Sequence, residues 1–154
     1  MTTERYFTVA EAEALIPEME AVFREIDGMR DRLARRMDKI KILDAMWGPK
    51  VRDPGNPDRD EFLGHRKAVR SAMREIEDCI DRGIIAKGVR FPQGGLEHGL
   101  VDFPTRFEGR TVFLCWQRGE DEIRAWHEVE AGFAGRRPLT ADQAARMGRG
   151  DGPA

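Results

Sequence analysis

The sequence predicts an α+β fold, in which a long antiparallel helical hairpin packs on a small antiparallel sheet of about three strands and short C-terminal helices follow. Between Leu15 and Trp47, apolar residues recur in steps of three and four, which is the spacing of one buried helical stripe. Turn-forming residues at 48–57 then separate this segment from a second amphipathic segment. Beyond Lys87 the apolar pattern becomes that of extended strands.

The ends of the two long helices follow from capping signals. Thr8 and Glu11 have the spacing of a capping box, so the first helix should begin after Thr8. Pro17 lacks an N–H group and is expected to kink the first turns of that helix. The second helix should begin near Asp58 and end at Gly83, which suits a left-handed C-cap.

The strongest strand signals are the segments 100–105 and 111–117, which we expect to form a hairpin. Glu108-Gly109 is a suitable two-residue turn between them. A turn at this place fixes the register and sets Asp102 directly opposite Cys115. The sequence therefore predicts a carboxylate beside a thiol on one side of the hairpin.

The remaining segments are shorter. Residues 89–91 are a candidate third strand, and residues 119–130 are expected to form a short helix. A second capping box at residues 140–143 predicts a brief terminal helix. We expect residues 1–139 to form a single α+β domain and residues 140–154 to form the short helix and a disordered tail.

Composition excludes several classes of protein. The chain has 26 Lys and Arg against 28 Asp and Glu and a formal net charge of -2, so it has no global field that attracts nucleic acid or anionic lipid. Its longest apolar run, residues 112–116, is far below the roughly 20 residues of a membrane-spanning helix. We recognise no secretory signal at the N-terminus, so a cytoplasmic protein is expected. Cys79 and Cys115 belong to no paired-cysteine motif, so they are expected to be reduced thiols in the core.

Several short motifs together resemble a family of small prokaryotic proteins of unknown function. The resemblance runs from about Tyr6 to Leu139, and it implies that any shared chemistry lies in residues 99–138. It implies no activity, so whether the protein is an enzyme stays open. The motifs are Tyr6-Phe7-Thr8 with Glu11-Ala12, Leu15-Ile16-Pro17, Gly99-Leu100-Val101-Asp102-Phe103-Pro104, Leu114-Cys115-Trp116, Gly119-Glu120, Trp126-His127 and Gly132-Phe133-Ala134-Gly135-Arg136.

His127 is the first candidate metal ligand, because an imidazole binds metals and carries protons near neutral pH. On the expected helix, Glu130 lies on the face of His127, whereas Glu120 lies about 10 Å away along the axis and cannot share a metal with His127. A carboxylate from another element is needed, and Asp102, whose cross-strand neighbour is Cys115, is the best available. A set of Asp, Glu and His side chains with oxygen and nitrogen donors would suit a divalent first-row metal. The alternative is that His127 is a hydrogen-bonded packing residue.

Asp102 and Arg136 form a candidate site for a small anionic ligand, together with Cys115. A carboxylate in an apolar strand is costly to bury alone, so Asp102 needs a partner. Asp102 is either a functional carboxylate, or it is satisfied structurally by a backbone cap or by an ion pair with Arg136 or Arg110. The glycine-rich loop at 132–137 either holds a carboxylate or phosphate with its arginines, or is a tight turn whose arginines bind Asp102 or Glu130.

The leading functional hypothesis is a self-associating or partner-binding module. The long hairpin has more apolar face than a small sheet covers, so the remainder is expected to be buried in a homodimer or against a partner helix. Methionines at helical spacing are interpreted as core filler, although such faces also form adaptable interfaces. The alternative function is a metal-binding or anion-binding pocket, possibly catalytic, at Asp102, His127 and Arg136.

A basic stripe on the first helix raises the question of nucleic-acid binding. In an antiparallel hairpin this stripe faces acidic residues of the second helix, and pairing between the helices explains it more simply. The sequence therefore does not favour nucleic acid as a partner. The stripe consists of Arg32, Arg35, Arg36 and Lys39, and the acidic residues are Glu75, Glu77 and Asp78.

Overall fold

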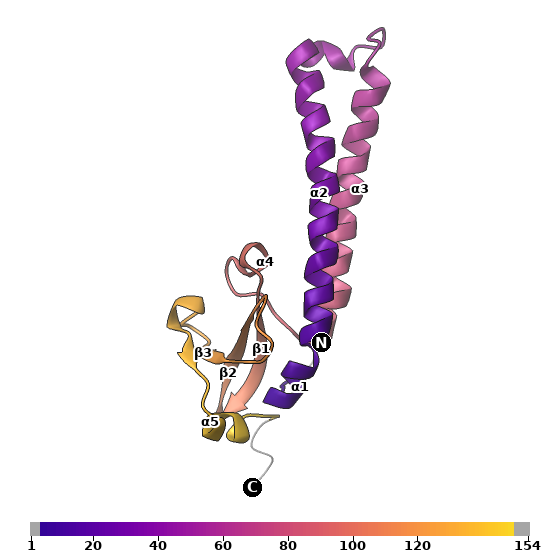
Figure 1. The fold of residues 1–154 in the computed structure, drawn as a ribbon. Coiled ribbons are helices and arrows are strands. Elements are labelled where there is room, and N and C mark those ends of the chain that lie inside the picture. The colour runs from indigo at the N-terminus through magenta and orange to yellow at the C-terminus, as the bar shows by residue number, and fades with distance from the viewer. Residues whose placement is uncertain (1–3, 150–154) are drawn as a thin grey trace. The chain divides into compact units, whose positions relative to one another are not determined.

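The computed structural model describes residues 4–149 and confirms the α+β class (Figure 1). The α-helices are α1 (Val9–Ala14), α2 (Ile16–Trp47), α3 (Arg59–Gly83), α4 (Gly95–His98) and α5 (Ala141–Arg146). The strands are β1 (Leu100–Phe107), β2 (Arg110–Gln117), β3 (Ala125–Glu128) and β4 (Arg137–Pro138). Short 3-10 helices are η1 (Gly48–Arg52), η2 (Ile85–Lys87) and η3 (Phe133–Gly135). Within residues 4–149, no helix is both long and apolar enough to cross a membrane.

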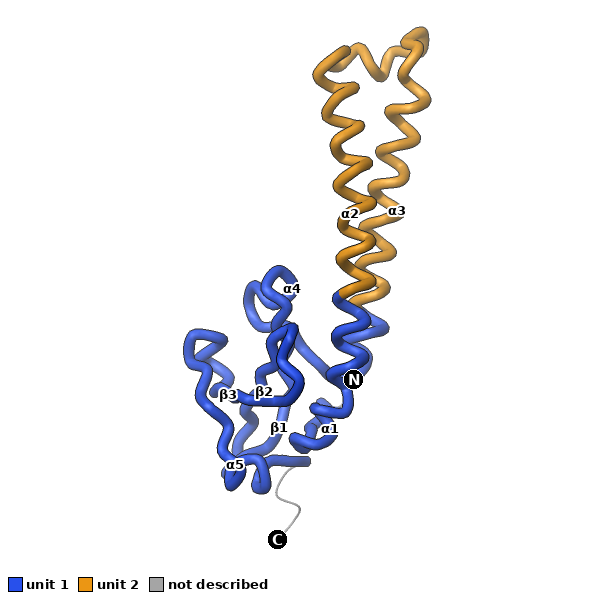
Figure 2. Tube along the Cα trace, viewed as in Figure 1, with its two compact units in different colours: residues 1–23, 81–154 blue, residues 24–80 orange. Residues whose placement is uncertain are grey.

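The chain divides into two compact units (Figure 2). One unit contains Met1–Phe23 and Asp81–Ala154, and it includes the whole sheet. The other unit is Arg24–Ile80, which contains most of α2, η1 and most of α3.

The second unit is an antiparallel pair of long helices joined through η1. The first long helix ends at Trp47, where the apolar stripe read from the sequence also ends, and α3 begins one residue after the expected Asp58. Near the connection, Leu43, Val51 and Phe62 form a buried apolar cluster. The indole Nε1 of Trp47 donates a hydrogen bond of 2.8 Å to Asp58 Oδ2. These contacts hold the two helix ends together where the chain reverses.

The start of the first helix shows both a confirmed detail and a difference. The capping box is present, since Thr8 Oγ1 accepts the Glu11 amide at 3.1 Å and Glu11 Oε1 accepts the Thr8 amide at 3.0 Å. The expected kink is replaced by a full break at Leu15, which separates α1 from α2. Pro17 therefore occupies the second position of α2, where its missing N–H has no helical partner to lose.

The sheet has four strands in the order β1-β2-β3-β4, and each neighbouring pair is antiparallel. The predicted hairpin register is confirmed, with Asp102 opposite Cys115. Glu108 and Gly109 both have positive φ, at 50° and 78°, as a tight I′-type turn requires. The candidate strand at 89–91 contributes only an isolated bridge between Arg90 and Asp102.

The helix expected over residues 119–130 is wrong. Ala125–Glu128 form β3 and pair with β2, so that His127 lies opposite Phe113. The charged residues before this segment favoured a helix only through local propensity, which is weak beside the pairing that the edge of β2 offers. His127 is therefore on a strand, and the helical argument about which residues share its face does not apply.

The methionines of the helical pair only partly fill a core. Met19 is fully buried, as expected for core filler. Met37, Met46 and Met73 are 44%, 63% and 52% exposed, so that interpretation is wrong for these three. Neither Cys79 nor Cys115 forms a disulfide, and both side chains are buried, as predicted.

The end of the described chain contacts the body of the first unit. The predicted capping box of the terminal helix is confirmed, with Thr140 and Gln143 exchanging hydrogen bonds at 3.0 and 3.1 Å. Gly148 then forms an isolated bridge with Arg106. The rest of the tail predicted to be disordered, residues 150–154, lies outside the described residues.

Candidate functional site

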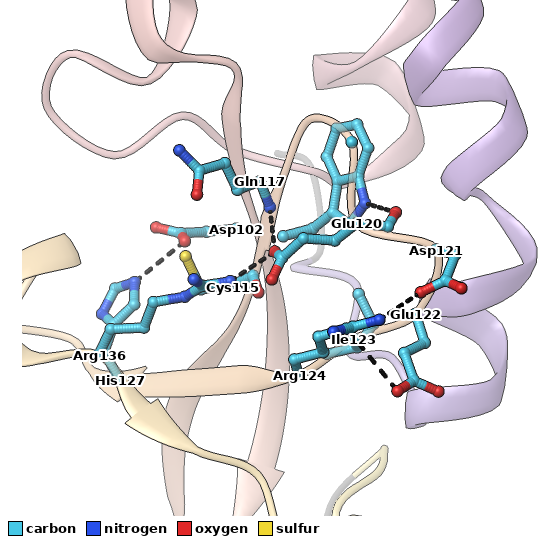
Figure 3. Close-up of polar contacts among 12 residues, drawn as sticks. Asp102, Cys115, Gln117, Glu120, Asp121, Glu122, Ile123, Arg124, His127 and Arg136 are labelled. Atoms are coloured by element: carbon cyan, nitrogen blue, oxygen red, sulfur yellow. Dashed lines mark hydrogen bonds and ion pairs between the residues drawn. The ribbon is translucent and has the colours of Figure 1, made fainter.

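Three chemically active side chains meet on one side of the sheet (Figure 3). Asp102 on β1 and Cys115 on β2 are directly opposed, and His127 on β3 lies diagonally across from Cys115. Diagonal neighbours on adjacent strands are within reach of a long side chain. One donor atom from each of the three residues lies within 4.8 Å of the other two.

Hydrogen bonds fix the protonation of the imidazole of His127. Its Nδ1 lies 2.8 Å from the backbone oxygen of Glu128. A carbonyl oxygen only accepts hydrogen bonds, so Nδ1 carries a hydrogen and donates it. The other ring nitrogen, Nε2, lies 3.0 Å from Asp102 Oδ1. A hydrogen bond there needs one proton, so His127 and Asp102 share a single proton between Nε2 and the carboxylate.

Burial and charge shift the titration of two of these groups. The imidazole of His127 is 1% exposed, and burial opposes its charged form. Its hydrogen bonds to Asp102 and to the Glu128 carbonyl outweigh burial and raise the pKa of His127 above its ordinary value. Burial, together with the nearby charge of Asp102, raises the pKa of Cys115 to about 12. The thiol is therefore protonated at neutral pH and is no nucleophile by itself.

Arg136 lies beside the cluster, but its acidic partner is Glu120 rather than Asp102. The Nη2 atom of Arg136 contacts Glu120 Oε1 at 2.5 Å and lies 3.4 Å from the backbone oxygen of Cys115. Glu120 Oε1 also accepts the backbone amide of Gln117 at 2.7 Å. The ion pair between Asp102 and Arg136, one of the alternatives for Asp102, is therefore not formed, and the carboxylate of Asp102 contacts His127 instead.

The other arginine considered for Asp102 is also paired elsewhere. Arg110 forms a two-nitrogen contact with Glu128, through Nε at 2.6 Å and Nη2 at 2.5 Å. This pair lies at the far end of β2 from Cys115, where β3 ends. Asp102 thus depends on His127 for its side-chain partner.

The structure separates the predicted metal ligands into three groups. Asp102, Cys115 and His127 converge. Glu130 lies in the turn after β3 and is exposed. Glu120 is no longer ruled out by helix geometry, but its carboxylate is held by Arg136.

One buried histidine is absent from the candidates that the sequence suggested. His65 on α3 is 6% exposed, and its Nδ1 lies 3.0 Å from Arg36 Nη1. Arginine can only donate, so Nδ1 accepts and Nε2 carries the hydrogen, 3.5 Å from Glu61 Oε1. The spacing of Glu61 and His65, one helical turn apart, was the available signal.

These features define a class of protein: a small α+β chain with a buried carboxylate, thiol and imidazole on three adjacent antiparallel strands. The chain belongs to the family described as uncharacterized conserved protein (DUF2203), whose model matches residues 5–139. No curated protein and no solved structure matches the chain. The family match includes all three residues of the cluster, and it confirms the resemblance to a family without a known activity.

Proposed function

We propose that this protein binds a divalent metal ion of the zinc class through Asp102, Cys115 and His127. The observation that supports the proposal is the convergence of their oxygen, sulfur and nitrogen donors within 4.8 Å of one another. Zinc bonds of about 2.0–2.3 Å in a tetrahedral arrangement set ligand atoms roughly 3.3–3.8 Å apart. Small side-chain rotations would therefore bring the three atoms around one ion.

The Nδ1 side of the His127 ring makes the kind of hydrogen bond that metal-binding histidines make. Such a histidine donates its other ring N–H to a carbonyl or carboxylate, which fixes the ring and directs the remaining nitrogen to the metal. The hydrogen bond of 2.8 Å from His127 Nδ1 to the Glu128 oxygen has this role. It points Nε2 toward Asp102 and Cys115.

The charge balance also supports a dication. Without metal, the cluster contains a protonated Cys115 thiol and one proton shared by Asp102 and His127. Replacing these two protons by one divalent ion leaves the net charge of the buried cluster unchanged. Burying the loaded site therefore adds no uncompensated charge, which would be costly at this depth. The charge of Arg136 is compensated by Glu120.

Cobalt binding tests this proposal directly, because a cobalt–thiolate bond gives charge-transfer absorption in the near ultraviolet. We expect the full chain to bind one Co²⁺ with this band and to release it to Zn²⁺. Cys115→Ala should abolish the band and weaken binding by at least about tenfold. The matched control is Cys79→Ala, which removes the other buried thiol, on α3. A wild-type chain without the band, or equal bands in both variants, would contradict the proposal.

We propose secondly that the helical pair self-associates with another copy of the chain. Ile42 and Met46, one turn apart on α2, are 59% and 63% exposed and form an apolar pair on the same side of the helix. A second copy offers the same surface and can bury both pairs in a two-fold contact. Sedimentation at micromolar concentration should give a dimer, which Ile42→Lys dissociates and Ile85→Lys, at an exposed residue of the other unit, does not. A wild-type monomer would contradict this proposal.

A further inference from the structure

The helical pair contains a cluster of positively charged residues that shares no residue with the three-residue cluster of the sheet. A cavity of about 390 Å³ opens near η1, with Lys41, Arg52, Arg66 and Arg70 among its lining residues. A neighbouring cavity of about 480 Å³ shares the three arginines and adds Lys67. All of these residues belong to the unit Arg24–Ile80. We call these five cations the basic pocket.

The basic pocket lacks internal charge compensation. Among the described residues, none of its five cations has a carboxylate within 4.0 Å of its charged nitrogens. Arginines elsewhere in the chain commonly have such a partner, for example Arg110 with Glu128 and Arg136 with Glu120. Asp44 is the only carboxylate among the described residues that line the two cavities. Like charges gathered without partners repel one another, and a bound anion relieves that repulsion.

Two of the guanidinium groups lie near one aromatic ring. The guanidinium carbons of Arg52 and Arg66 lie 5.5 and 5.9 Å from the ring centroid of Phe62. Phe62 is 3% exposed and belongs to the buried cluster with Leu43 and Val51. This buried ring therefore offers a cation–π contact to both guanidinium groups and favours conformations in which they lie close together.

We propose that the basic pocket binds a small oligophosphate, such as the phosphate chain of a nucleoside triphosphate. Guanidinium forks match phosphate oxygens in pairs, and several uncompensated cations call for several anionic groups. The cavity volumes of about 390 and 480 Å³ are within the range of small-molecule sites. A long nucleic acid is disfavoured because the whole chain has a formal net charge of -2.

The test is isothermal titration of the full chain with inorganic tripolyphosphate at roughly 0.15 M salt. Divalent metals are kept out, because tripolyphosphate chelates them, and the measurement is repeated with Cys115→Ala. Since the basic pocket is independent of the proposed metal site, that variant should bind as the wild type does. We expect the double variant Arg66→Gln, Arg70→Gln to lose at least about tenfold in affinity, because it removes two phosphate-binding forks.

The matched control is Arg32→Gln, Arg35→Gln, which removes two charges from another basic surface of the same unit. It should change the affinity less than about twofold, since it leaves the five cations intact. Parallel titrations with ATP and with orthophosphate show whether the base contributes and whether one phosphate suffices. The proposal is overturned if tripolyphosphate does not bind, if both double variants lose affinity equally, or if orthophosphate or a short duplex DNA binds more tightly.

Discussion

Replacing Asp102 by alanine is expected to destabilise the protein by about 3–5 kcal/mol, since removing one member of a buried charged pair leaves the other uncompensated. Asp102 is 3% exposed and its side chain contacts His127 Nε2 at 3.0 Å. In Asp102→Ala the imidazole has no partner for Nε2, and a cavity remains. Asp102→Asn should cost only about 1 kcal/mol, because its amide can donate to Nε2 of a neutral imidazole.

Denaturant unfolding, followed by tryptophan fluorescence, measures these losses. Trp116 and Trp126 lie on β2 and β3 and report on the unit that contains the cluster. The control is Glu122→Ala, whose side chain is 61% exposed and which should change stability by less than about 0.5 kcal/mol. A loss below about 1 kcal/mol for Asp102→Ala would mean that the contact with His127 contributes little. Equal large losses for alanine and asparagine would contradict the replacement of the carboxylate by an amide that donates to Nε2.

The parts of the fold that the sequence predicted are those with a local cause. A two-residue turn at Glu108-Gly109 fixes every opposed pair of its hairpin, so Asp102 opposite Cys115 followed from the turn alone. The capping box of Thr8 and Glu11 is likewise contained within four residues. The juxtaposition of the carboxylate and the thiol in the candidate site therefore follows from the sequence alone.

The position of His127 depended on a contact distant in sequence and was predicted wrongly. Ala125–Glu128 are four residues, too few to show a reliable alternation, and the charged residues just before them resemble a helix start. These four residues are extended because they pair with the edge of β2 as the short strand β3. The same difficulty applies to the ion pair of Arg136. The sequence offers several carboxylates that could pair with this arginine, and only the folded chain shows that its partner is Glu120.

Metal is expected to invert the pH dependence of stability. Without metal, the pKa of His127 in the folded state is raised above its ordinary 6.5. A group with a raised folded pKa contributes its full stability below the unfolded pKa and loses it as pH rises through the folded value. The metal-free protein should therefore lose stability as pH rises above 6.5. With metal bound, the opposite is expected, because ligand protons compete with the ion and rising pH removes them.

The number of protons released makes this a quantitative prediction. Below the folded pKa of His127, one metal ion displaces the shared proton and the Cys115 proton, so the apparent affinity should rise by about 100-fold per pH unit. Above it only the thiol proton remains, because the pKa of Cys115 is about 12, and the rise should fall to about tenfold per pH unit.

Competition titrations of Zn²⁺ against a chromophoric chelator, repeated across this pH range, measure both slopes. In Cys115→Ala, metal binding should release one proton fewer, so that each slope should fall by about tenfold per pH unit. Cys79→Ala should change neither slope. A two-proton slope that survives Cys115→Ala would show that the second proton comes from another group. A metal-free protein that gains stability through pH 6.5 would contradict the proton shared by Asp102 and His127.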